Sequence, residues 1–304
     1  MKKIKSEREY KMVKGTTRVC GVMANPVEHS MSPVLHNYIA KKMNIDMVYV
    51  PLKVLENDLS CAIKGAYALN LLGMNVTIPH KQSVIKELVS LDNAAEIVGA
   101  VNTLVHSENG YKGFNTDILG CFRALEEACI EICGETVLLI GAGGAAKAVA
   151  YLLGTKKAKK VYILNRSLNK AEELADYMNG VFKSEIFFAM ELKNIGQLAD
   201  KNIVHKKYLA IQTTSVGMYP NINDCPVEDE AIYSLIHTAM DIVYKPLETK
   251  FLEKVKMSGG KTLNGLSMLL YQGIIAFELW NGVLVTDDVA NGAYELMENL
   301  LIKE

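Results

Sequence analysis

The stretch TVLLIGAGGAAKAVA, from Thr136 to Ala150, decides the fold of this chain. Its first five residues form a β-branched and aliphatic run of the kind that fills a strand buried on both faces. A glycine cluster follows at once, and a run of small, helix-forming residues begins at Ala145. The order of strand, glycine turn and helix predicts a Rossmann-type unit that binds a dinucleotide.

Residues of this turn have distinct physical tasks in such a unit. Gly141 would permit the tight turn, Gly143 would let the backbone approach a pyrophosphate, and Ala146 would let the helix pack closely on the strand. The anion would lie at the helix N-terminus, where free N–H groups and the helix dipole favour negative charge. A tight strand-to-helix connection without a ligand is the alternative interpretation. The expected cofactor contacts come from Gly141, Ala142, Gly143, Gly144 and Ala145.

The composition is that of a globular protein long enough for two domains. Of its 304 residues 50% are hydrophobic and 22% are charged, and 33 Lys+Arg against 34 Asp+Glu leave a net charge of −1. This balance excludes a global field that would attract nucleic acid or an anionic membrane. Apolar runs all stop short of the roughly 18 residues of a membrane span, and the charged N-terminus predicts no signal peptide.

The six cysteines are scattered through the chain without a C-x-x-C pair, so we expect neither a disulfide framework nor a zinc site. Cys129 and Cys133 lie one helical turn apart, but two ligands do not make a structural metal site. We therefore predict reduced and mostly buried thiols, no bound metal, and a cytoplasmic protein.

Strands and helices alternate along the chain, which predicts an α/β fold with mostly parallel sheets. In the first part we expect strands at 18–23, 47–52, 71–76 and 101–106 and helices at 33–43, 56–69 and 82–88. In the second part we expect strands at 160–164, 185–188, 208–212 and 239–243 and helices at 118–128, 248–257, 265–280 and 287–300. The polar residues up to about number 15 are expected to precede the folded core.

The helix expected from Gly265 to Trp280 contains a single charged residue, Glu278, so it must be buried nearly all round. Such a helix suits the interface between two domains, and we expect the last two helices to return to the first domain. The predicted division is a first domain at 1–116 and 265–304 and a Rossmann-type dinucleotide-binding domain at 117–264.

Four short polar clusters follow predicted strands of the first domain, where open α/β sheets place their ligands. Each also has a purely structural interpretation, since Ser32 and Asp117 suit helix N-caps and Lys81 suits a solvated surface position. Hydroxyls at a helix start can equally hold a polyol or a carboxylate. The clusters are His29-Ser30-Met31-Ser32-Pro33, Asn75-Val76-Thr77-Ile78-Pro79-His80-Lys81, Ala100-Val101-Asn102-Thr103 and Gly113-Phe114-Asn115-Thr116-Asp117.

Taken together, the clusters resemble in order, and nearly letter for letter, the S-x-S-P, N-V-T-x-P-x-K, A-V-N-T and G-x-N-T-D motifs of the shikimate dehydrogenase family. The turn G-A-G-G-A, the segment Asp241-Ile242-Val243-Tyr244 and the stretch GLSMLLYQ at 265–272 extend the resemblance to about residues 17–300. Seven ordered motifs are far more specific than any one of them. The family transfers a hydride reversibly between NADP(H) and the ring carbon shared by 3-dehydroshikimate and shikimate, in aromatic amino-acid biosynthesis.

The resemblance implies that Lys81 and Asp117 are a catalytic pair in the first, substrate-binding domain. Reducing a ketone leaves negative charge on oxygen, and a lysine ammonium could polarise and then protonate that oxygen while the carboxylate orients it. Substrate contacts are implied for Ser30, Ser32, Asn75, Thr77, Asn102, Thr116, Tyr244 and Gln272, and further cofactor contacts for Ile242 and Gly265. These hydroxyls and amides suit a small polyhydroxylated acid.

Cofactor choice depends on the end of the next strand, about 20 residues beyond the glycine turn, where NAD-binding folds place an acid. This chain has Asn165-Arg166-Ser167 there, with Lys170 one turn later and no acid. Two cations and a hydroxyl suit a 2′-phosphate, so we predict NADP over NAD. Solvated cations at a helix start are the alternative interpretation.

Gln212 departs from the family's pattern, because Asn is usual at this position of the segment N-x-T-S-x-G-M. The polar extension before Thr17 is also longer than usual.

A quinate/shikimate dehydrogenase, which often accepts NAD, is the runner-up, and a metabolite-binding module without catalysis is a second alternative. The acid missing near Arg166 argues against the first, and the retained Lys81 and Asp117 argue against the second. The expected partner is a small-molecule substrate, with no nucleic acid and no membrane, and a homodimer is left open as the assembly.

Overall fold

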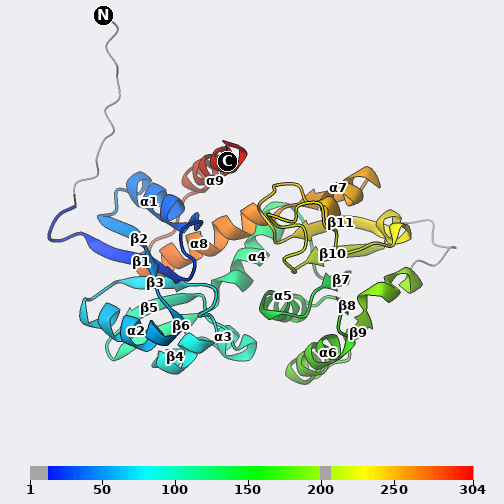
Figure 1. Ribbon diagram of the computed structural model, residues 1–304, viewed down its shortest axis with the longest axis horizontal. Coiled ribbons are helices and arrows are strands. Elements are labelled where there is room, and N and C mark those ends of the chain that lie inside the picture. Colours follow the sequence, from blue (N-terminus) through cyan, green and yellow to red (C-terminus); the bar gives the residue numbers. More distant parts are fainter. Residues whose placement is uncertain (1–12, 199–206, 304) are drawn as a thin grey trace, which may run out of the picture.

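The computed structural model describes residues 13–198 and 207–303 and shows two α/β lobes side by side (Figure 1). Most of the expected N-terminal extension lies outside these residues. The first lobe contains the N-terminal strands, and the second contains the strands that follow the glycine-rich stretch. The mixed α/β architecture predicted from the alternation of strands and helices is confirmed.

The first lobe is built on a six-stranded sheet in the order β2-β1-β3-β5-β6-β4. Its strands are β1 (Arg18–Ala24), β2 (Met47–Lys53), β3 (Gly73–Val76), β4 (Ser90–Leu91), β5 (Thr103–Ser107) and β6 (Gly110–Phe114). β1 pairs in parallel with β2 and β3, whereas β5 pairs antiparallel with β3 and β6. β6 was not predicted, because two glycines in a five-residue strand hide the usual β pattern.

Both faces of this sheet are covered. Cys20 and Val22 of β1 belong to a core shared with α1 (Ser32–Lys42), whereas Met23 points to the core formed with α2 (Leu59–Ala68). The helix expected at 82–88 is a 3-10 helix, η2 (Ser83–Glu87), and a second 3-10 turn, η1 (Glu56–Asp58), precedes α2. A short helix that we did not predict, α3 (Asn93–Val98), lies between β4 and β5.

The second lobe has a six-stranded sheet in the order β12-β11-β10-β7-β8-β9, with every neighbouring pair parallel. Its strands are β7 (Thr136–Ile140), β8 (Lys160–Asn165), β9 (Phe187–Glu191), β10 (Tyr208–Gln212), β11 (Ile236–Asp241) and β12 (Lys261–Leu263). The helices are α5 (Gly144–Thr155), α6 (Leu168–Phe182) and α7 (Lys250–Met257), with 3-10 turns η3 (Leu192–Leu198) and η4 (Glu230–Leu235). This is the doubly wound Rossmann order, which reverses between β7 and β10.

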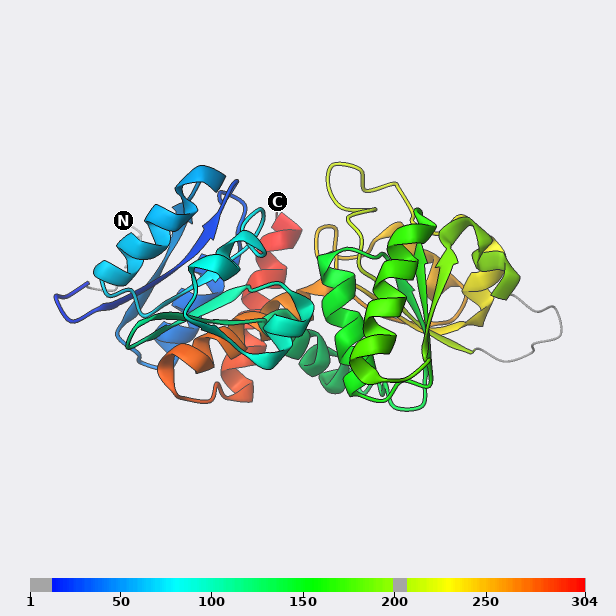
Figure 2. The ribbon, with the colours of Figure 1, turned by 90° about the horizontal axis from the view of Figure 1, so that it is seen from below.

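Two long helices, α4 (Thr116–Glu127) and α8 (Gly265–Asn281), run between the lobes, and a third, α9 (Asp287–Lys303), follows α8. α8 is buried on most sides, as its single charge predicted, and it packs along α4. A Cβ on Gly120 of α4 would lie 2.6 Å from the backbone nitrogen of Gln272, so a glycine is required for this close approach. α8 and α9 both contact α1 and lie with the first lobe (Figure 2).

All six cysteines lie in the described ranges and are free thiols. Cys20 and Cys121 are buried, but Cys61, Cys129 and Cys133 are exposed, so the expectation of mostly buried thiols is wrong. Cys129 adopts a positive φ of 54° in the turn after α4, where the chain leaves the core. Within 13–198 and 207–303 we find no group of three or more His, Cys, Asp or Glu side chains that could hold a metal ion.

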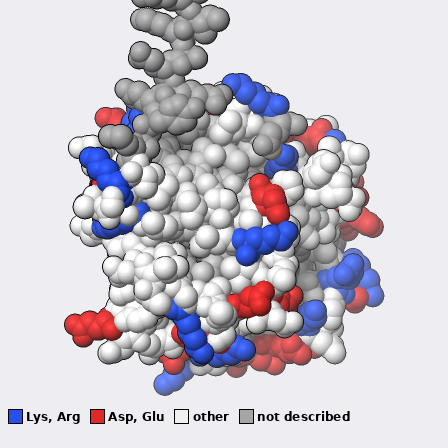
Figure 3. Space-filling view, turned by 60° about the vertical axis from the view of Figure 1, so that its left-hand side comes forward, with Lys and Arg blue, Asp and Glu red and all other residues white. Residues whose placement is uncertain are grey.

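The surface agrees with a net charge near zero. Basic and acidic side chains are interspersed on the face shown in Figure 3, without a large region of one sign. Among the helices in the described part of the chain, none has the length and apolar character needed to cross a membrane.

Candidate active site

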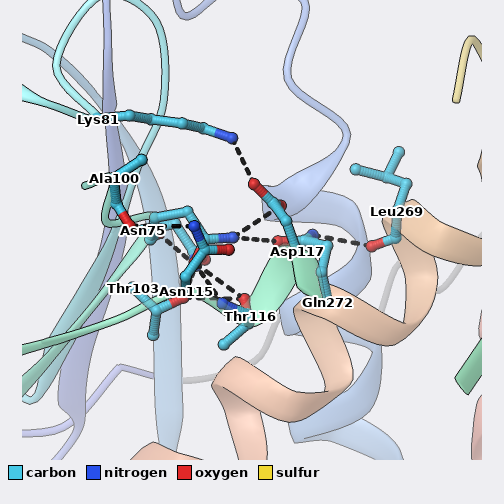
Figure 4. Close-up of polar contacts among 10 residues, drawn as sticks. Asn75, Lys81, Ala100, Thr103, Asn115, Thr116, Asp117, Leu269 and Gln272 are labelled. Carbon is cyan, nitrogen blue, oxygen red and sulfur yellow. Dashed lines mark hydrogen bonds and ion pairs between the residues drawn. The ribbon is translucent and has the colours of Figure 1, made fainter. Parts of the chain in front are cut away.

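Lys81 and Asp117 lie side by side although 36 residues separate them in the chain. Lys81 follows β3, and Asp117 lies in the first turn of α4 (Figure 4). The Nζ atom of Lys81 is 2.7 Å from Oδ2 of Asp117, and the two side chains are 33% and 20% exposed. The ammonium therefore has a fixed position that solvent, and hence a small ligand, can still reach.

The two helix-cap interpretations are wrong. The N-cap of α4 is Asn115, whose side chain makes no capping hydrogen bond, while the carboxylate of Asp117 is held by other side chains. Similarly, Ser32 is the first residue of α1, and the N-cap position is taken by Met31. The polar groups of Ser32 and Asp117 are thus not committed to starting their helices.

Asn102 links the ion pair to the sheet. Its Nδ2 donates to Oδ1 of Asp117 at 2.8 Å, and its Oδ1 accepts from the backbone N–H of Thr116, also at 2.8 Å. Gln272 of α8 completes the group, because its Oε1 lies 3.5 Å from Nδ2 of Asn102 while its Nε2 donates to the carbonyl of Leu269 (Figure 4). Both oxygens of the Asp117 carboxylate therefore accept from side-chain donors, Oδ2 from Lys81 and Oδ1 from Asn102.

The other predicted substrate residues lie at different depths. Ser30, Ser32, Thr77 and Tyr244 are partly exposed, and burial raises the pKa of Tyr244 above its ordinary value. Among the residues that the structure describes, none of these four hydrogen-bonds to Lys81 or Asp117, so their roles stay predictions. The amide of Asn75 is buried and donates to the carbonyl of Asn102 and to Thr103.

Three buried residues in the hydrogen-bond network around the pair received no role from the sequence. Thr103 is fully buried and donates to Oδ1 of Asn102, and Asn115 donates to the carbonyl of Ala100. Tyr49 donates to Oδ1 of Asn75 at 2.7 Å. Thr103 and Asn115 belong to the quoted motifs and could have been singled out. Tyr49 could not, because a tyrosine within a strand is typical of any core.

The glycine turn after β7 has the shape of an anion site. Gly141 has a φ of 113°, and a Cβ there would lie 2.6 Å from Oγ1 of Thr213, so only glycine fits. At Gly143 and Gly144 a Cβ would find no heavy atom of the described chain within 4 Å. Gly143 is the N-cap of α5 without a side-chain cap, which leaves the first N–H groups of the helix available. Open space in front of free N–H groups fits a pyrophosphate.

The basic cluster after β8 lies at the surface. Asn165 donates to the carbonyl of Ser167 at 2.9 Å, which shapes the turn into α6. Arg166 and Lys170 are exposed and, within the described residues, form no ion pair. The acid aligned with Asn165 on β9, Glu191, is instead paired with Lys193 at 2.9 Å. The side chains of Arg166 and Lys170, which follow β8, are thus available to contact a phosphate.

Gln212, the departure from the family's pattern, has a clear structural task. Its Nε2 donates to the carbonyls of Thr214 and Val216 and to Oδ1 of Asp241 at 3.3 Å, and its Oε1 accepts from the N–H of Thr214. These bonds fold the loop after β10, which lies against Gly141 of the glycine turn. The longer side chain of Gln212 therefore stabilises the loop after β10 through hydrogen bonds to its backbone.

Asp241, which ends β11, is fully buried and accepts from the N–H of Val243 and the hydroxyl of Thr249 at 2.9 and 2.7 Å. Burial raises the pKa of its carboxyl to about 6. The next residue, Ile242, packs its carbonyl against Gly265, where no side chain would fit. Ile242 and Gly265, both expected at the cofactor, thus lie together at the start of α8.

Comparison with known proteins agrees with this geometry. Family models match three parts of the chain: Shikimate dehydrogenase substrate binding domain at 22–104, Shikimate / quinate 5-dehydrogenase at 124–204, and Shikimate 5'-dehydrogenase C-terminal domain at 265–285. The shikimate dehydrogenase (NADP(+)) of Desulforamulus reducens is 41% identical over 96% of this chain and 97% of its own length.

Among the solved structures that resemble this chain, two cover most of it and were determined with bound ligands. A shikimate dehydrogenase crystallised with NADP+ has a TM-score of 0.84 and 37% identity, covering 94% of this chain and 97% of its own. The shikimate 5-dehydrogenase of Listeria monocytogenes, in complex with shikimate and NAD, has a TM-score of 0.86 and 33% identity, with coverages of 95% and 99%.

Proposed function

The chain belongs to the shikimate dehydrogenase family, and we propose that it catalyses the reversible NADP-dependent reduction of 3-dehydroshikimate to shikimate. The observation that carries the proposal is the 2.7 Å ion pair between Lys81 and Asp117. The pair is reachable by solvent, held by Asn102, and formed between the loop after β3 and the first turn of α4, elements other than those of the glycine turn. An acid and a cation at this place serve a reaction in which charge develops on oxygen.

Lys81 is the group that we assign to the carbonyl oxygen. Bound NADPH supplies the hydride that the substrate carbon receives. Because Asp117 and Asn102 hold the ammonium and its partner in place before the reaction, Lys81 needs little reorganisation to stabilise the developing charge and to donate a proton. In the oxidation of shikimate, the hydroxyl proton returns to the pair or to water.

The substrate residues that we propose supply hydroxyls and amides for a carboxylate and ring hydroxyls. Asn102, Thr116 and Gln272 are supported by their place beside the ion pair. The remaining members rest on their motifs. The proposed set is Ser30, Ser32, Asn75, Thr77, Asn102, Thr116, Tyr244 and Gln272.

The NADP site that we propose lies at the reversal point of the second sheet. The turn from Gly141 to Ala145 would hold the pyrophosphate, with Ile242 and Gly265 close to the nicotinamide end. The 2′-phosphate would meet Asn165, Arg166, Ser167 and Lys170, whose exposed cations support the assignment.

We propose the domain division as 1–116 with 265–304 for substrate and 117–264 for the cofactor, supported by the packing of α8 and α9 on α1. A cytoplasmic location and a homodimer are likewise proposals. Light scattering on the purified chain tests the second, and cell fractionation tests the first.

The experiment that tests the function follows the nicotinamide absorbance of the purified chain with shikimate or quinate and with NADP+ or NAD+. We expect shikimate with NADP+ to give the highest kcat/KM. Comparable values with quinate would favour a quinate/shikimate dehydrogenase. Ligand binding without turnover would favour a binding module.

A further inference from the structure

Tyr49 lies behind the proposed active site, on β2, and is 2% exposed. Its ring stacks on the imidazole of His36, with centroids 4.2 Å apart, and lies 5.9 Å from the ring of Trp280. His36 is fully buried, and burial lowers its pKa to about 3, so this ring is a neutral packing surface at physiological pH. The aromatic rings therefore hold the Tyr49 hydroxyl in a single place.

A chain of buried hydrogen bonds runs from this hydroxyl to the catalytic carboxylate. Tyr49 donates to Oδ1 of Asn75 at 2.7 Å, and Nδ2 of Asn75 donates to Oγ1 of Thr103 at 3.0 Å. Thr103 donates to Oδ1 of Asn102 at 3.0 Å, and Nδ2 of Asn102 donates to Oδ1 of Asp117 at 2.8 Å. Figure 4 shows the links from Asn75 onward, converging on Asp117.

The direction of these hydrogen bonds follows from the donors and acceptors that each side chain has. A phenol has one proton, and Tyr49 gives it to the carbonyl oxygen of Asn75, which turns the NH₂ group of Asn75 toward Thr103. The hydroxyl of Thr103 accepts that bond and is left with its own proton, which goes to Oδ1 of Asn102 directly or to Oγ1 of Thr116, a hydroxyl that also donates to Oδ1 of Asn102. Each member thus donates toward the ion pair, and aligned donors of this kind strengthen one another in a low dielectric.

We propose that Tyr49 is a positioning residue for the reaction: through Asn75, Thr103 and Asn102 it fixes the carboxylate of Asp117 and, with it, the ammonium of Lys81. The inference rests on the proposed function and deepens it. To the motif-based substrate role of Asn75 it adds the task of transmitting this constraint, since the Asn75 amide donates to the carbonyl of Asn102 and to Thr103.

The test is Tyr49→Phe in the full chain, which removes one oxygen and keeps the stacked ring. In the variant the side-chain oxygen of Asn75 loses its donor, so the direction of the hydrogen bonds between Asn75 and Asp117 is no longer fixed. We expect the single-turnover rate of hydride transfer to fall about threefold to tenfold, while KM for shikimate changes less than about twofold. Tyr49 is buried and is not among the proposed substrate residues, and a shift in the pair matters mainly when charge develops.

Tyr111→Phe is the matched control. Tyr111 belongs to the same sheet, is 1% exposed, and donates its hydroxyl to the carbonyl of Leu71 at 2.9 Å, apart from the chain that leads to Asp117. Both variants remove one buried tyrosine hydroxyl and should lower Tm by similar amounts. Only Tyr49→Phe should slow hydride transfer, because a loss of stability alone does not change the rate of the folded enzyme.

Thr103 provides a second test, one link closer to the pair. Thr103→Val, which removes the hydroxyl, should slow hydride transfer at least as much as Tyr49→Phe, and Thr103→Ser should restore the rate. Wild-type rates in both Tyr49→Phe and Thr103→Val, or equal slowing in Tyr111→Phe, would overturn the inference. Failure of the unsubstituted chain to oxidise shikimate would instead overturn the proposed function, so the two failures are distinguishable.

Discussion

Two aspartates, Asp117 at the start of α4 and Asp241 at the end of β11, differ in their charge partners and in their exposure to solvent. Asp117 is 20% exposed and faces the ammonium of Lys81 at 2.7 Å. Asp241 is fully buried and, within the described chain, hydrogen-bonds only to the neutral donors of Val243, Thr249 and Gln212. A carboxylate that meets a cation and solvent can take part in chemistry, whereas one surrounded by neutral donors holds loops together.

The architectural task of Asp241 can be followed through its donors. Gln212 connects it to the loop after β10, and Thr249 connects it to the start of α7, where the same hydroxyl also accepts from the N–H of Leu252. The carboxyl is kept in place although burial disfavours its charge. The difference teaches that the second lobe uses this acid to hold together the loop after β10 and the start of α7.

Lys81→Met should have the largest effect, because it removes the cation that distinguishes the two sites. We expect kcat to fall by about 10³-fold, in the range typical of a lost general acid. Stability should change little, since Lys81 is partly exposed. Steady-state kinetics measure the effect, and Lys256→Met, which breaks the exposed pair with Glu248, is the control. An unchanged kcat would remove Lys81 from the chemistry.

Asp241→Asn should change the pH dependence of stability. The pKa of Asp241 is raised from 3.8 to about 6 in the folded state, so the folded state binds more protons than the unfolded state between these values. Wild type therefore loses stability relative to the variant as pH rises from about 4 to about 6, by up to about 3 kcal/mol. Above pH 6 the difference is constant.

Urea unfolding at several pH values measures this difference. A wild-type stability that rises relative to Asp241→Asn over the same pH range would contradict the assignment of a buried carboxyl without a cation. The turnover of shikimate at saturating cofactor should be much less affected than in Lys81→Met, because Asp241 ends β11 of the second lobe and has no contact with the ion pair of Lys81 and Asp117 in the described residues.

Arg166→Ala should separate cofactor recognition from chemistry. Loss of a charge-assisted contact to the 2′-phosphate should raise KM for NADP+ by about tenfold and leave KM for NAD+ nearly unchanged. The kcat value should stay within about twofold of wild type, because Arg166 lies outside the ion-pair network. Steady-state kinetics with both cofactors test this, and parallel changes for NADP+ and NAD+ would contradict the assignment.

Gln212→Asn should have the smallest effect. The shorter amide keeps the chemistry but reaches fewer of the partners that Gln212 holds, so we expect a loss of about 1 kcal/mol in the free energy of unfolding. KM for NADP+ should rise by no more than about threefold. Thermal unfolding and kinetics measure both quantities, and an increase in Tm would show that the loop prefers the residue usual in the family.

The sequence predicted most of the fold because local patterns determined it. The apolar strand before Gly141 and the single charge between Gly265 and Trp280 indicate a buried strand and a buried helix without any knowledge of their neighbours. β4, α3 and β12 were missed because they are short. β6 was missed because two glycines hide its β pattern, and it owes its strand conformation to its hairpin partner β5. Tertiary pairing overrides weak local preference in such segments.

The sequence predicted which residues belong to the candidate site, but not the hydrogen bonds between them. Motifs identified Lys81, Asp117, Asn102 and Gln272, which come from four separate segments. Their hydrogen bonds arise only when the end of β3, the start of β5, the first turn of α4 and the middle of α8 meet. Tyr49 entered the network for the same reason, since nothing in its local sequence distinguishes it from a core residue.

By itself, the sequence determined the family, the type of cofactor and the residue types available for chemistry, because these depend on motifs of a few adjacent residues. Only the tertiary structure decided that Asp117 would meet a cation and that Asp241 would be sealed among neutral donors. The physical reason is that burial and charge partners are set by neighbours distant in the chain, and the same carboxylate changes its properties with them.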